Sequence, residues 1–152
     1  TEIYTLSLHD ALPILGGGTT GISILKDAKV IYTDDEATGG SHMTMTVAGH
    51  YRIPYEEAEV LKTQPEKEAE IFPVIKATVE KMALITEKFL KGYQVPAVYV
   101  VGGSSMFTEF TSVFEKRLHL PVYRPVHPLL VTPLGIAYCC QLPELSSKKE
   151  VK

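Results

Sequence analysis

The pattern of apolar and polar positions predicts strands near the start of the chain and a mixture of helices and strands after them. Apolar residues alternate over 19–25 and again over 29–33, and the short polar segment 26–28 between them predicts an antiparallel hairpin. Apolar residues recur at helical spacing over 69–90, which predicts the longest helix. The continuous apolar run 96–101 is typical of a buried strand.

Shorter elements fill the rest of the chain. Ser41 is placed to cap a helix at its N-terminus, and Pro133 suits the first turn of the last helix. The pattern predicts short helices at 41–49, 55–63, 107–118 and 132–140, and a short strand at 121–123.

The hairpin begins with a glycine-rich turn that has the composition of a phosphate-binding loop. Gly16, Gly17 and Gly18 allow the backbone to come close to a ligand, so that successive amide N–H groups can surround an anion. The hydroxyls of Thr19 and Thr20 offer further donors, or contacts to a hydrated metal. The alternative is a tight turn between two strands with no ligand, and the motif alone does not decide between them.

Two further glycine pairs are candidates for ligand contact. Gly39 and Gly40 precede a predicted helix, and they fit a plain loop and helix cap at least as well as a nucleotide contact. Gly102, Gly103 and Ser104 follow the buried strand and precede a helix, where exposed amides and the helix dipole favour polar or anionic groups.

Side-chain chemistry adds one candidate pair. Glu59 and Lys62 are three residues apart on one helical face, so they form either a surface ion pair or a polar clamp beside a ligand. Cys139 and Cys140 are adjacent and lack the spacing of a metal site, so we expect them to be small core residues. No cluster of histidine, cysteine or carboxylate residues has the spacing of metal ligands.

Composition places the chain among ordinary globular proteins. Its 152 residues suffice for one domain with a single buried core, or for two small lobes that share one core, and 45% of the residues are hydrophobic and 22% charged. Fifteen basic and eighteen acidic side chains give a net charge of −3, which argues against a nucleic-acid partner. No apolar run approaches the roughly 20 residues of a membrane helix, and there is no secretory leader, so we expect no membrane partner and a cytoplasmic location.

The two ends of the chain are expected to contribute nothing to function. Residues 1–14 (TEIYTLSLHDALPI) resemble a translated sequencing adapter and are expected to be an artefactual leader. Pro13 would make 11–15 a poor central strand. Residues 143–152 form a charged tail that is expected to be disordered.

Several motifs together resemble the second lobe of the actin-like ATPase superfamily, which includes actin, the heat-shock chaperone ATPases, MreB, FtsA and the sugar kinases. They are GGGTTG from Gly16, TGG from Thr38, AEVLK from Ala58 and VVGGSSM from Val100. Within that superfamily the chain is most similar to an ethanolamine-utilisation family, over nearly all of 16–137. The resemblance implies an α/β, ribonuclease H-like lobe over 15–142, a mixed sheet flanked by helices, with a small helical subdomain inserted at about 41–66.

The resemblance also implies a nucleotide site. It would bind ATP or ADP with Mg²⁺ in the complete parent protein. The first glycine turn (residues 16–18) would lie at the phosphates and the third glycine turn (residues 102–104) at adenosine. The charged pair, Glu59 and Lys62, would lie at ribose and adenine. The residues implied to bind the cofactor are Gly16, Gly17, Gly18, Thr19, Thr20, Gly39, Gly40, Glu59, Lys62, Gly102, Gly103 and Ser104.

Two departures from the superfamily pattern bear on activity. The acidic residue usual two places before the glycine triplet is Ile14 here, and the resemblance implies that the first lobe is absent from this chain. Because phosphoryl transfer needs positioning from both sides of the phosphate chain, no catalytic residue is assigned and we expect no ATPase activity.

The implied function is an ATP-binding, chaperone-like accessory protein of ethanolamine utilisation, whose protein partner would belong to ethanolamine catabolism or its microcompartment. The alternatives are an actin-like filament or scaffold protein and a fragment of a sugar-kinase-like phosphotransferase. Fold alone does not choose among them.

Overall fold

A five-stranded mixed sheet forms the centre of the protein in the computed structural model, which describes residues 11–27 and 29–140. The strand order is β3-β2-β1-β4-β5. β1 pairs antiparallel with β2, and β2 with β3, while β4 runs parallel to both β1 and β5. The strands are β1 (Ala11–Leu15), β2 (Thr20–Lys26), β3 (Lys29–Glu36), β4 (Val98–Tyr99) and β5 (Val122–Tyr123).

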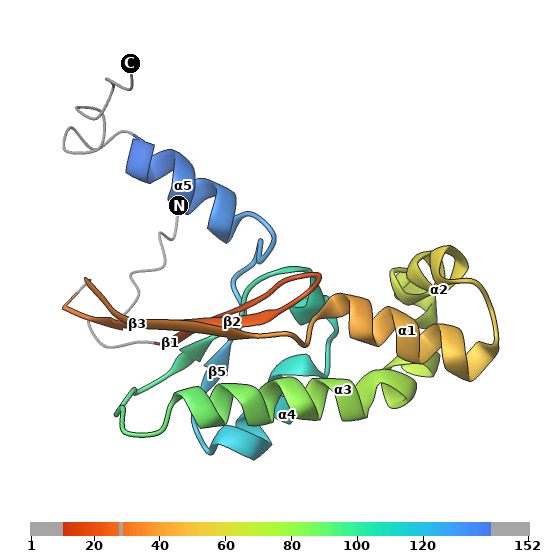
Figure 1. Ribbon diagram of the computed structural model, residues 1–152, viewed down its shortest axis with the longest axis horizontal. Coiled ribbons are helices and arrows are strands. Elements are labelled where there is room, and N and C mark those ends of the chain that lie inside the picture. The colour runs from red at the N-terminus through yellow and green to blue at the C-terminus, as the bar shows by residue number, and fades with distance from the viewer. Residues whose placement is uncertain (1–10, 28, 141–152) are drawn as a thin grey trace.

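Helices flank this sheet unevenly. Figure 1 shows α3 and α4 along one face, α1 and α2 beyond one end of the sheet, and α5 on the opposite side from α3. The α-helices are α1 (Gly40–Tyr51), α2 (Tyr55–Lys62), α3 (Glu68–Phe89), α4 (Phe110–Leu118) and α5 (Val131–Cys140), with 3-10 turns η1 (Pro65–Lys67) and η2 (Gly103–Met106). The predicted fold class, a mixed sheet flanked by helices, is confirmed. No helix in the described ranges is long and apolar enough to cross a membrane.

The core lies between the sheet and α3. Alternate residues of β1 and β2 point toward the helix, and Leu15, Ile22 and Ile24 are almost completely buried. The apolar stripe of α3, which includes Ile75 and Val79, meets them in the same cluster. Each such side chain contributes about 1.5–3 kcal/mol when it leaves water, so this layer stabilises the strands that carry the glycine turns.

The expectation for Pro13 was wrong, because residues 11–15 form the central strand β1. The proline lacks an N–H, but its neighbours compensate on either side. Ala11 N–H donates to Ala97 O (3.3 Å) and Leu15 N–H donates to Val101 O (2.8 Å). Residues 11–14 of the predicted leader therefore belong to the sheet, while 1–10 lie outside the described residues.

Two helix starts also differ from expectation. Gly39 caps α1, and the Ser41 hydroxyl donates instead to Gly17 O (2.8 Å). α4 begins at Phe110 because η2 occupies the residues directly after the glycine pair. The predicted tail 143–152 and the side chains of residues 139–140 lie outside the described part of the structure.

Candidate functional site

A cavity of about 710 Å³ opens where the glycine turns meet α1 and α2. Seven of the twelve predicted site residues line it, and the other five are not among the lining residues. Those on the wall are Gly16, Gly17, Gly40, Glu59, Lys62, Gly103 and Ser104; those off it are Gly18, Thr19, Thr20, Gly39 and Gly102.

The first glycine turn is bonded to the start of α1. Gly40 N–H donates to Gly16 O (3.0 Å), and Ser41 N–H donates to Gly17 O (2.7 Å). These two amides of the helix N-terminus are therefore used within the protein. The helix holds the turn in place rather than offering these donors to an anion.

Gly39 allows this close approach between the helix and the turn. A Cβ atom at this position would lie 2.6 Å from backbone atoms of Gly17, Gly18 and Thr19. Because none of these atoms belongs to a flexible side chain, only glycine fits here without movement of the backbone.

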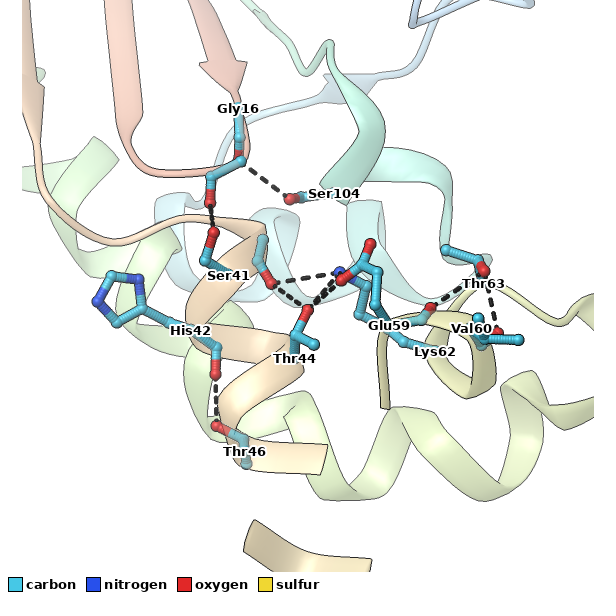
Figure 2. Close-up of polar contacts among 12 residues, drawn as sticks. Gly16, Ser41, His42, Thr44, Thr46, Glu59, Val60, Lys62, Thr63 and Ser104 are labelled. Carbon is cyan, nitrogen blue, oxygen red and sulfur yellow. Dashed lines mark hydrogen bonds and ion pairs between the residues drawn. The ribbon is translucent and has the colours of Figure 1, made fainter. Parts of the chain in front are cut away.

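The third glycine turn lies directly beside the first. The Ser104 hydroxyl is 3.5 Å from Gly16 O, as Figure 2 shows. Gly102 has a φ of +95°, and a Cβ atom there would lie 2.4 Å from Leu15 O. The strand end before the first turn and the start of the third turn are thus packed backbone to backbone.

The exposed part of the first turn retains free donors. The amides of Gly17 and Gly18 make no hydrogen bond within the described ranges, and both residues are exposed. Thr19 is exposed as well, whereas Thr20 is buried and its hydroxyl donates to Thr38 O (2.7 Å). Thr20 therefore stabilises the base of the turn, and the donors that can reach an anion come from the residues before it.

Glu59 and Lys62 join α2 to α1. Lys62 Nζ lies 2.7 Å from Glu59 Oε2, 2.8 Å from Thr44 Oγ1 and 3.3 Å from Gly40 O. Thr44 also hydrogen-bonds to the Glu59 carboxylate. The Lys62 side chain is 10% exposed and that of Glu59 is 44% exposed. The pair is therefore a tertiary link between α2 and α1, whose contacts Figure 2 shows, and not a surface ion pair. Both residues line the cavity.

The same contacts change the acidity of Glu59. Partial burial opposes ionisation, but the hydrogen bonds from Lys62 and Thr44 and the charge of Lys62 together outweigh it. The pKa of Glu59 is lowered, so the group that lines the cavity is a carboxylate at neutral pH.

Sequence reasoning missed several residues of the cavity wall. Thr44 is fully buried on the same face of α1 as Met43, and a polar residue on an apolar helical face was the available signal. Met106, Phe107 and Leu129 give the wall near the third turn its apolar character. Nothing in the local pattern indicated these three, because they come from a 3-10 turn and two loops.

The described residues do not fit a resident metal ion. Among them no group of three or more histidine, cysteine or carboxylate residues could hold one. The position before the turn at which the superfamily places an acid is Ile14, inside β1. The described residues thus contain no preformed cluster of metal ligands, and no chemical step is assigned to a bound ion.

Comparison with known proteins agrees with this architecture. The family model for cell division protein FtsA matches residues 15–146. The chain belongs to the FtsA family of actin-like proteins. The ethanolamine utilization protein EutJ of Salmonella typhimurium strain LT2 is 46% identical over 124 residues, and that of Escherichia coli strain K12 is 44% identical over 124 residues. Each alignment covers 81% of this chain and 44% of the relative, so the chain spans about half the length of these proteins.

Solved structures show the same relationship. The crystal structure of EutJ from Carboxydothermus hydrogenoformans has a TM-score of 0.81 at 45% identity, over 86% of this chain and 49% of that one. MreB5 of Spiroplasma citri, solved bound to ADP, has a TM-score of 0.78 at 15% identity, over 95% of this chain and 57% of that one. The second likeness shows the fold alone. The predicted kinship with EutJ and the actin-like fold is thus confirmed.

Proposed function

We propose that the cavity binds an adenine nucleotide, ATP or ADP. The observation that carries the proposal is the contact between the first and third glycine turns at Gly16 and Ser104, beside the same cavity that Glu59 lines. Two glycine-rich turns that are far apart in sequence thus form one wall of the cavity, and the Glu59 carboxylate lines the same cavity. A cavity of about 710 Å³ is within the range of small-molecule and cofactor sites.

The chemistry of the wall supports one orientation of the nucleotide. The free amides of Gly17 and Gly18 suit phosphate oxygens, since backbone N–H groups in a turn make an anion-binding concavity. The apolar side chains of Met106, Phe107 and Leu129 suit the base.

Glu59 and Lys62 have different parts in this proposal. The Lys62 ammonium has three hydrogens, and three acceptors within the protein lie within reach of it. It therefore positions Glu59, and the half-exposed Glu59 carboxylate accepts a hydrogen bond from a ribose hydroxyl.

At the level of the cell, the proposed role is that of an ATP-binding, chaperone-like accessory protein of ethanolamine utilisation, located in the cytoplasm. The identity of 46% to EutJ supports the link to that process. Nucleotide state would change the contacts with a protein partner of ethanolamine catabolism or its microcompartment. Magnesium would accompany the nucleotide and would be bound mainly through the phosphates, since no cluster of three or more possible metal ligands lies within the described ranges.

Hydrolysis is not part of the proposal for this chain. It spans 44% of the length of its EutJ relatives, and phosphoryl transfer depends on groups on both sides of the phosphates. We expect no magnesium-dependent ATP hydrolysis by the pure protein. Clear turnover that is abolished by Thr19→Ala would overturn this expectation.

Isothermal calorimetry with ATP and with ADP tests the site. A Cβ atom at Gly17 would meet nothing within 4 Å, so we expect Gly17→Val to be tolerated by the fold while it adds bulk at the cavity wall. We expect saturable binding that Gly17→Val weakens by about tenfold or more. The matched control is Gly49→Val, an equally unobstructed glycine on α1 away from the cavity. Equal loss in both variants, or binding unaffected by Gly17→Val, would contradict the assignment.

A further inference from the structure

A second carboxylate lines the cavity besides that of Glu59. Glu68 is the first residue of α3, and its partly buried side chain belongs to the cavity wall. Glu59 is bonded to Lys62 and Thr44, which join α2 to α1. Glu68 makes none of these contacts and hydrogen-bonds elsewhere, so its position in the wall needs a separate explanation.

Two contacts place Glu68 next to the apolar part of the wall. Its Oε1 atom accepts a hydrogen bond from the backbone N–H of Thr108. One helical turn further along α3, the Phe72 ring packs on the Phe107 ring, with centroids 6.0 Å apart. Phe107 directly precedes Thr108 and lines the cavity, as does Met106. The start of α3 is therefore fixed against the segment that the proposed site uses for the base.

The bond to Thr108 determines what Glu68 can offer a ligand. A carboxylate accepts hydrogen bonds and donates none. Thr108 occupies Oε1, and Oε2 has no partner in the described ranges, so one acceptor atom is left. Gln64 also lines the cavity, but its carboxamide has both donors and an acceptor and therefore suits either kind of base edge. Of these two side chains, only Glu68 can discriminate between bases.

Purine bases differ in what they present to a single acceptor. Adenine has an amino group at position 6, whereas guanine and hypoxanthine have a carbonyl oxygen there. A carboxylate oxygen accepts a hydrogen bond from the amino group and repels the carbonyl oxygen. Guanine could instead donate from its N1–H and its 2-amino group together, but that arrangement needs both carboxylate oxygens, and one of them is bonded to Thr108.

We propose that Glu68 selects 6-amino purines, with Oε2 accepting a hydrogen bond from the amino group of adenine while Thr108 holds Oε1. The inference rests on the proposed nucleotide site and adds the residue that determines which base the site takes. A site built to hydrogen-bond a ligand group rejects an analogue that lacks it, because the protein's own polar atom is then left unpaired. Glu59 contacts the ribose in this account, and Glu68 reads the base.

Calorimetric titrations with ADP and with inosine diphosphate (IDP), which has a carbonyl in place of the amino group, measure the selectivity. We expect ADP to bind about tenfold more tightly than IDP, or better. Glu68→Gln should shift the ratio of the two dissociation constants toward IDP by about tenfold or more. Only the new amide oxygen can accept from Thr108 N–H, so the amide NH2 turns toward the base, where it can donate to the IDP carbonyl.

Two control variants separate base selectivity from other effects. Glu66→Gln changes an exposed carboxylate of η1 that does not line the cavity, and should leave both affinities unchanged. Gly17→Val, on the phosphate side of the proposed site, should weaken ADP and IDP by similar factors. Because Glu68→Gln keeps the bond to Thr108, its circular dichroism should match that of the wild type.

The outcomes distinguish this inference from the proposed function. Equal affinities for ADP and IDP would overturn the inference and leave the nucleotide site standing. A ratio that Glu68→Gln does not change would do the same, since a purely structural role lowers both affinities alike. If neither nucleotide bound saturably, the nucleotide site itself would be overturned, and the selectivity with it.

Discussion

The hydroxyl oxygen of Ser104 lies 3.5 Å from the carbonyl oxygen of Gly16, although 88 positions separate the two residues. The contact joins the turn after β1 to the turn after β4. Both strands run in the same direction and pair through Ala11 and Val98, so their carboxyl ends meet at one edge of the sheet. Ligands commonly bind at this edge in open α/β sheets.

The close packing of Gly102 against Leu15 predicts a large effect of a small substitution. Gly102→Ala adds a Cβ atom 2.4 Å from Leu15 O at a φ of +95°, so it should lower the free energy of unfolding by about 1–3 kcal/mol. Urea denaturation measures the loss. Gly103→Ala is the control, because its Cβ atom would meet only Leu129 Cδ2 at an ordinary 3.5 Å. Equal stability of the two variants would contradict the geometry.

The close packing of Gly39 against the first glycine turn predicts a similar loss of stability. Its control is expected to change stability in the opposite direction. Gly39→Ala should destabilise the protein by about 1–3 kcal/mol, because three backbone atoms lie 2.6 Å from the new methyl group. Gly49→Ala, in the same helix with nothing within 4 Å, should instead stabilise it by about 0.5–1 kcal/mol. Thermal unfolding of both variants gives the comparison, and a neutral Gly39→Ala would show that the turn is looser than described.

Substitution of Lys62 should lower the stability of the protein more than substitution of Lys67, whose ion pair also joins residues three apart but lies outside the cavity. Lys62→Met removes the cation that holds Glu59, Thr44 and Gly40 together, and should cost about 1–3 kcal/mol of stability. Lys67 pairs with Glu70 on the surface, so Lys67→Met should change stability little. Chemical denaturation of the two variants distinguishes a tertiary link from a solvated ion pair, for which the two losses would be alike.

The lowered pKa of Glu59 predicts a pH dependence. A carboxyl whose pKa is lower in the folded state stabilises the protein above its unfolded pKa of about 4.3 and loses that contribution as pH falls through the folded value. The stability advantage of the wild type over Glu59→Gln should therefore be full at neutral pH and shrink in acid. Melting temperatures at several pH values measure it. Glu57→Gln is the control, since the Glu57 side chain is exposed on the same helix and makes no hydrogen bond or ion pair in the described ranges.

Sequence periodicity was sufficient to predict the elements that bury one face in the core. The stripe of α3 over 69–90 and the alternation of β2 each repeat over several turns or pleats, and both were placed to within one residue or two. Central placement of β1 could not be predicted from local rules, because Pro13 is tolerated only through hydrogen bonds from Ala11 and Leu15 to a strand more than 80 residues away.

Part of the candidate site was also predictable, from composition rather than from periodicity. Glycine pairs identify turns by composition, and Gly16, Gly40 and Gly103 all line the cavity. The partners of those turns were not predictable. Thr20 was expected to face a ligand, but its hydroxyl bonds to Thr38 O in the interior, and Lys62 was weighed as a surface residue although it is 10% exposed. Both depend on non-local packing.

The most direct measurement of the central claim is a titration of isotope-labelled protein with ADP, followed by amide chemical shifts. It detects even weak, millimolar binding and reports the site residue by residue. The account predicts saturable shifts at the amides of Gly17, Gly18, Gly103 and Ser104, with none at the α3–α4 surface around Leu84. An absence of shifts at millimolar ADP, or saturable shifts confined to residues outside the cavity, would contradict it.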